Sequence, residues 1–103
     1  MMRLEKQEIF TRLQQNTTHI QSLGVQRLGL FGSYVRGEQT DTSDVDLLVE
    51  FEAGKKTFDS FMSLAFYLED LLERPVELVT PESISPHIRP YISREVQYVA
   101  LMG

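Results

Sequence analysis

The chain contains no cysteine, so a disulfide framework and thiolate metal sites are both excluded. It has no run of 18 apolar residues and no apolar signal segment near its start, so we expect a cytoplasmic protein. Internal repeats and low-complexity runs are absent too, and the content of 42% hydrophobic and 24% charged residues is ordinary for a folded protein. Carboxylates, histidines and the backbone remain as possible metal ligands.

Basic residues are also scarce. Ten Lys and Arg residues stand against 15 Asp and Glu residues, which gives a net charge of -5. Proteins that hold nucleic acid by neutralising its phosphates need a basic face, so we expect no direct binding of nucleic acid. The length of 103 residues predicts a single domain, 1–103, with one core and no second lobe for a substrate. The molecule that it acts on is therefore expected to come from outside.

Hydrophobic periodicity predicts an α/β fold. Apolar residues at helical spacing predict helices, apolar or alternating runs predict strands, and Gly and Pro mark the breaks. The expected elements are helices at 5–23 and 58–72, strands at 25–31, 44–51 and 76–79, a short helix after residue 32, and one or two short helices after residue 82. We expect a small mixed sheet that carries the acidic residues on one face and packs its helices on the other.

Gly32 and Ser33 directly follow the predicted strand 25–31. Gly32 would let backbone N–H groups approach a phosphate oxygen, and the Ser33 hydroxyl could donate to another or cap the short helix. Arg36 could reach a triphosphate from the same helix, although an exposed helix arginine is the alternative interpretation. Gly and Ser are also common in ordinary turns, so it is the acidic residues downstream that favour phosphate binding.

Asp44 and Asp46 occupy alternate positions in the predicted strand 44–51. Since successive side chains of a strand point to opposite faces, both carboxylates should lie on one face and Val45 on the other. Asp is disfavoured in strands, and two like charges so close repel unless a cation lies between them or one is protonated. Mg²⁺ suits such oxygen ligands best, and a solvated polar face on an edge strand is the alternative.

A third carboxylate, Glu77, lies in the predicted strand 76–79. Together with Asp44 and Asp46 it would support phosphoryl or nucleotidyl transfer assisted by two Mg²⁺ ions. The two aspartates would hold both ions, and Glu77 would complete the site and could help to accept the proton of the attacking hydroxyl. The Gly32–Ser33 turn would then grip the leaving pyrophosphate.

The chain resembles the minimal nucleotidyltransferases of the DNA polymerase beta superfamily over about residues 25–80. Their pattern is Gly-Ser, ten residues, Asp-x-Asp and a later acid on a strand, and it is matched here by Gly32, Ser33, Asp44, Asp46 and Glu77. Many members carry Asp at the last position, and the pattern allows Glu. The resemblance implies a DNA polymerase beta-like nucleotidyltransferase fold.

Small members of this kind resemble the MNT antitoxins that accompany HEPN-domain ribonuclease toxins. The resemblance implies transfer of AMP from ATP to a tyrosine hydroxyl of the toxin, with Mg²⁺ as cofactor, loss of toxin activity, and a hetero-oligomer of antitoxin and toxin. Two alternatives stay open. One is a nucleotidyltransferase that modifies a small molecule such as an aminoglycoside, and the other is an antitoxin that neutralises its toxin by binding alone. The sequence does not identify the acceptor residue, the nucleotide preference or the stoichiometry.

Overall fold

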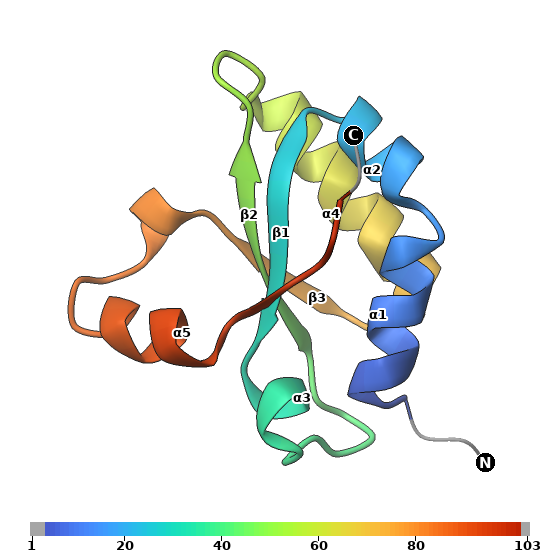
Figure 1. Cartoon of the computed structure of the whole chain (residues 1–103), viewed down its shortest axis with the longest axis vertical. Helices are drawn as coiled ribbons and strands as arrows, with labels where there is room; N and C mark the ends of the chain where they lie inside the picture. Colours follow the sequence, from blue (N-terminus) through green and yellow to red (C-terminus); the bar gives the residue numbers. More distant parts are fainter. Residues whose placement is uncertain (1–3, 102–103) are drawn as a thin grey trace.

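A computed structural model describes residues 4–101 (Figure 1). The first three and last two residues, which the predicted domain 1–103 includes, lie outside the described residues. The elements in chain order are α1 (Lys6–Gln14), α2 (Thr17–Ser22), β1 (Val25–Phe31), α3 (Ser33–Arg36), β2 (Val45–Phe51), α4 (Phe58–Leu72), β3 (Val76–Val79), the 3-10 helix η1 (Pro81–Ser83), α5 (Arg89–Glu95) and β4 (Gln97–Tyr98). Within the described range, no helix has the length and apolar character needed to cross a membrane.

The sheet has the strand order β3-β2-β1-β4. β1 pairs antiparallel with β2 and with β4, and β2 pairs parallel with β3. The sheet is therefore mixed, as predicted, and its two central strands are those that deliver the chain to the Gly32 turn and carry Asp46. Helix α4 supplies the crossover between the parallel strands β2 and β3, which cannot be joined by a tight turn.

Helices α1, α2 and α4 pack together on one face of the sheet (Figure 1). The alternating residues of β2 point into this main core, and Val45, Leu47 and Val49 are fully buried there. Their partners come from all three helices and from β1, and include Ile9, Leu13, Ile20, Leu28, Leu30, Leu64, Leu68 and Leu72. The predicted period of two in this strand is confirmed, and it leaves the other face of β2 to Asp46 and Leu48.

The face that carries Asp46 is not bare. A second, smaller core cluster lies on it, formed by Phe31, Leu48, Ile84 and Ile92. Ile84 directly follows η1 and Ile92 lies in α5, so the C-terminal segment packs on the face opposite α1, α2 and α4 (Figure 1). Short helices were predicted after residue 82, but neither this packing nor strand β4 was, and the expectation of helices on one face only is incomplete.

The predicted helix 5–23 is wrong in one respect, because it is divided into α1 and α2. The Asn16 side chain donates from Nδ2 to the carbonyl of Arg12 at 2.8 Å, and such local bonds compete with a continuous helix. Gly24 follows α2 with φ +90°, the left-handed conformation that is typical of a residue just past a helix end. Strands 25–31 and 76–79 and helix 58–72 are confirmed at both ends, whereas β2 begins at Val45, so Asp44 directly precedes the strand.

Candidate functional site

The ends of three strands meet where the sequence predicted a site. In the sheet register, Phe31 lies opposite Asp46 on the antiparallel neighbour, and Asp46 lies beside Glu77 on the parallel neighbour. Directly paired residues place their side chains on the same face. The register alone therefore brings Gly32, which follows Phe31, to the same corner of the sheet as Asp46 and Glu77.

Gly32 makes the closest approach in this corner. Its backbone has φ +82°, and a Cβ built on it would collide with the Oδ2 atom of Asp46. Only glycine combines this backbone conformation with so small a volume. The four-residue helix α3 follows and ends at Gly37 with φ +72°, while Tyr34 is buried in the main core and fixes the turn to the sheet.

Asp46 has a strongly perturbed acidity. The pKa of its carboxyl is raised to about 7, chiefly by burial and then by a hydrogen bond to Glu77 and the charges of Glu77 and Asp44, while the charge of Arg36 opposes the change. Removal of water disfavours the ionised form, and neighbouring negative charge adds to the cost. The corner thus holds more negative charge than its own cations balance, which favours a bound cation.

The three predicted ligands differ in exposure. Asp44 and Glu77 are exposed, Asp46 is partly buried, and within residues 4–101 no three His, Cys, Asp or Glu side chains are already arranged around one point as a metal centre. The donor set still fits Mg²⁺, since carboxylate oxygens are its preferred protein ligands and the charge around Asp46 is uncompensated. Glu77 already shares a hydrogen bond with Asp46, and a cation here would also need the exposed carboxylate of Asp44.

The loop before Asp44 is held by its own hydrogen bonds. The backbone N–H of Thr40 donates to Ser43 Oγ at 2.8 Å, and the N–H of Ser43 donates back to the Thr40 carbonyl at 3.1 Å. The buried amide of Gln39 donates to Glu5 Oε2 at 3.0 Å, which ties the same loop to the start of α1. These contacts fix the backbone from which Asp44 extends.

Two of the three residues predicted to bind phosphate, Gly32 and Arg36, already share a partner. The N–H of Gly32 donates to Glu95 Oε2 at 2.6 Å, and Arg36 Nη1 donates to both Glu95 oxygens at 3.0 and 3.1 Å. Arg36 Nε donates to Glu38 Oε1 at 2.9 Å. Ser33 is half-buried, and its hydroxyl has no partner in the described part of the chain.

Glu95 was not identified from the sequence. It lies 63 residues after Gly32, at the end of α5, in a segment where the residue pattern predicts only short helices. No motif marks it. The packing of Ile92 against Phe31 and Leu48 and the pairing of β4 with β1 bring the end of α5 to the turn.

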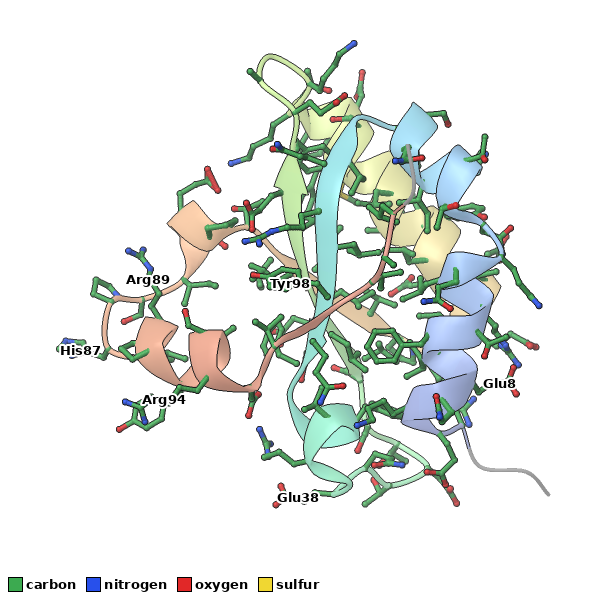
Figure 2. All side chains as sticks on the ribbon, viewed as in Figure 1. Glu8, Glu38, His87, Arg89, Arg94 and Tyr98 are labelled. Atoms are coloured by element: carbon green, nitrogen blue, oxygen red, sulfur yellow. The ribbon has the colours of Figure 1, made fainter. Side chains whose placement is uncertain are left out.

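The basic side chains of the C-terminal segment do not point toward this corner of the sheet. Figure 2 shows His87, Arg89 and Arg94 pointing away from the sheet. Arg89 Nη2 donates to the carbonyls of Pro81 and Ile84 at 3.3 and 3.1 Å, so its guanidinium holds the segment together. The charge of Arg36, by contrast, lowers the pKa of Asp46.

Several known proteins are similar to this chain in sequence and in fold. Residues 8–99 match a family model described as a nucleotidyltransferase domain. The protein adenylyltransferase MntA of Thermococcus cleftensis is 47% identical over 76 residues, which cover 74% of this chain and 76% of that protein. The match to the family model spans Gly32, Asp46, Glu77 and Glu95.

Two solved toxin–antitoxin complexes contain a similar chain. One is a crystal structure with AMP-PNP, which aligns with a TM-score of 0.62 and 29% identity and covers 85% of this chain and 73% of that chain. The other is the tri-AMPylated HEPN toxin of Shewanella oneidensis with its MNT antitoxin, which aligns with a TM-score of 0.55 and 26% identity over 87% of this chain and 71% of that chain.

Proposed function

Since the chain belongs to the nucleotidyltransferase domain family, we propose that it is an antitoxin that transfers AMP from ATP to a tyrosine hydroxyl of a HEPN ribonuclease toxin and so inactivates it. The observation that carries the proposal is the strand register that sets Gly32, Asp46 and Glu77 at one corner. The similarity to MntA supports protein as the acceptor, and the similar toxin–antitoxin complexes support a HEPN toxin and an adenine nucleotide as the partners.

The reaction needs three things from this corner. A tyrosine oxygen attacks the α-phosphorus, the new O–P bond forms, and the bond from the α-phosphorus to the bridging oxygen breaks as pyrophosphate leaves with the electron pair. The hydroxyl proton must go to a base, and the charge on the phosphate oxygens must be balanced. The acceptor and the α-phosphorus must also be held in line.

The residues divide between these tasks. Asp44, Asp46 and Glu77 would hold two Mg²⁺ ions, which when bound supply positive charge at the attacking and leaving oxygens. Glu77 is exposed next to Asp46, where it can receive the tyrosine proton.

The turn would hold the other end of the nucleotide. The N–H groups at Gly32 and Ser33, the unpaired Ser33 hydroxyl and the Arg36 guanidinium would hold the β- and γ-phosphates. The leaving pyrophosphate would then be fixed opposite the attacking hydroxyl.

Intact-mass spectrometry tests the proposal. The protein is incubated with ATP, Mg²⁺ and its HEPN-domain partner, and we expect the partner to gain one or more AMP masses. The double variant Asp44→Ala/Asp46→Ala should give none, whereas the matched variant Asp59→Ala/Asp70→Ala, which removes two exposed carboxylates of α4, should act as the wild type does.

Two results would contradict the proposal. If the double variant still neutralises the toxin and the toxin carries no added mass, the protein acts by binding alone. If AMP is found on an aminoglycoside offered in parallel and not on the toxin, the acceptor is a small molecule. In both cases the family assignment would stand and the proposed acceptor would fall.

A further inference from the structure

Glu95 occupies the position that a phosphate oxygen would need. Its carboxylate accepts a short hydrogen bond from the Gly32 N–H at 2.6 Å and two from Arg36 Nη1 at 3.0 and 3.1 Å, while its side chain is 23% exposed. Hydrogen bonds between a charged donor and a charged acceptor are among the stronger ones in proteins. The turn and its arginine are therefore filled by an anion that belongs to the protein itself.

A triphosphate cannot use the same donors while Glu95 holds them. The Gly32 N–H has a single proton to donate, and a carboxylate within hydrogen-bond distance repels a second anion at the same place. The corner already holds the carboxylates of Asp46 and Glu77 side by side, with Asp44 two residues before Asp46. A nucleotide that enters must displace Glu95 and then takes over both Gly32 and Arg36.

We propose that Glu95 is a positioning residue of the nucleotide site, which occupies the anion position at Gly32 and holds Arg36 until a triphosphate replaces it. The inference rests on the proposed function, because it assumes that a nucleotide binds at this turn. It goes beyond that function by assigning to the end of α5, outside the Gly-Ser and Asp-x-Asp pattern, a direct effect on nucleotide affinity.

The position of α5 does not depend on this contact. Ile92, one turn earlier, packs against Phe31 and Leu48 in the second core cluster, and the Val96 N–H donates to the Ile92 carbonyl at 2.9 Å. A substitution of Glu95 should therefore change the turn and leave the helix in place. The effect of the Glu95 carboxylate on nucleotide binding can therefore be tested without loss of the fold.

The test measures the dissociation constant of AMP-PNP in the presence of Mg²⁺ by titration calorimetry, on the full chain without partner. Glu95→Gln keeps the shape of the side chain and removes its charge, and we expect about fivefold tighter binding because the competing charge-assisted bonds are lost. Glu95→Asp keeps the charge but shortens the arm, so it should also bind more tightly than the wild type. Glu38→Gln is the matched control, since Glu38 bonds Arg36 but not Gly32, and it should stay within about twofold.

Each result of this titration either supports the proposal or overturns it. The proposal is overturned if Glu95→Gln binds AMP-PNP as weakly as the wild type or more weakly, which would make Glu95 a support for Arg36 or a ligand of the nucleotide complex. Equal gains in Glu95→Gln and Glu38→Gln would also overturn it, because net charge alone would then explain the effect. If Glu95→Asp binds AMP-PNP as the wild type does, the negative charge at position 95 weakens nucleotide binding without any contact to the turn. The proposal would then fail.

The same experiment separates this inference from the proposed function. Wild-type binding with no change in the Glu95 variants would refute the inference alone. Absence of AMP-PNP binding in every form would refute both. The expected order of affinities without any AMP transfer to a HEPN partner would uphold the role of Glu95 and refute the proposed acceptor.

Discussion

Replacement of Asp46 with asparagine should stabilise the metal-free protein while it abolishes its chemistry. The pKa of Asp46 is raised from 3.8 to about 7 by burial and by the neighbouring acids Glu77 and Asp44. Folding therefore favours the protonated form. The stability that this provides is fully present below about pH 4 and is lost as the pH rises through about 7. Asparagine is neutral throughout, so it carries no such loss at high pH.

The magnitude follows from the size of the shift. Three pH units correspond to about 4 kcal/mol at about 1.4 kcal/mol per unit. Asp46 is only partly buried, so screening by water reduces the figure, and we expect the free energy of unfolding of Asp46→Asn to exceed that of the wild type by about 2 kcal/mol at pH 8. At pH 4.5 the two proteins should agree within about 0.5 kcal/mol.

Urea denaturation in the presence of EDTA, at pH 4.5 and pH 8, measures the effect. The matched control is Asp70→Asn, at an exposed position of α4, which should shift stability by less than about 0.5 kcal/mol at either pH. Addition of Mg²⁺ at pH 8 should stabilise the wild type and not Asp46→Asn. Equal destabilisation of Asp46→Asn at both pH values would refute the reasoning. Packing, and not charge, would then determine the change in the free energy of unfolding.

Three further substitutions test the geometry. Gly32→Ala should cost about 2 kcal/mol of stability and remove AMP transfer, because its Cβ would meet Asp46 Oδ2 at φ +82°; a urea midpoint equal to that of the wild type would contradict this. Glu77→Gln should reduce the rate of AMP transfer at least about 100-fold in a single-turnover assay. Its thermal midpoint at pH 8 should not fall below that of the wild type, because loss of the Glu77 charge relieves repulsion at Asp46; a lower midpoint would contradict this. Thr57→Ala should lower stability by about 1 kcal/mol without affecting transfer, because the Thr57 side chain accepts from the Ser60 N–H at 3.0 Å at the start of α4; a loss of transfer would mean that the cap acts on the site.

The strands and the longest helix could be predicted because each carries a local pattern strong enough to outweigh its surroundings. The alternation of Val45, Leu47 and Val49 and the helical spacing of Leu64, Leu68 and Leu72 both lead to fully or almost fully buried faces. The division of the first helix could not be predicted from periodicity, because it depends on the bond of the Asn16 side chain to the Arg12 carbonyl. Strand β4 has only two residues and forms because Gly29 lets Val96 and Tyr98 approach.

What the sequence by itself determined is the residue types of the candidate site: a Gly-Ser turn and three acids, of which the strands bring Asp46 and Glu77 side by side. Residue types and short spacings are local, so they can be read along the chain. What only the tertiary structure decided is which atoms meet. The register sets Asp46 beside Glu77 and against Gly32, and the packing of α5 brings Glu95 onto the donors of the turn across 63 residues. Contacts at such separation depend on the packing of the whole domain, and no local pattern encodes them.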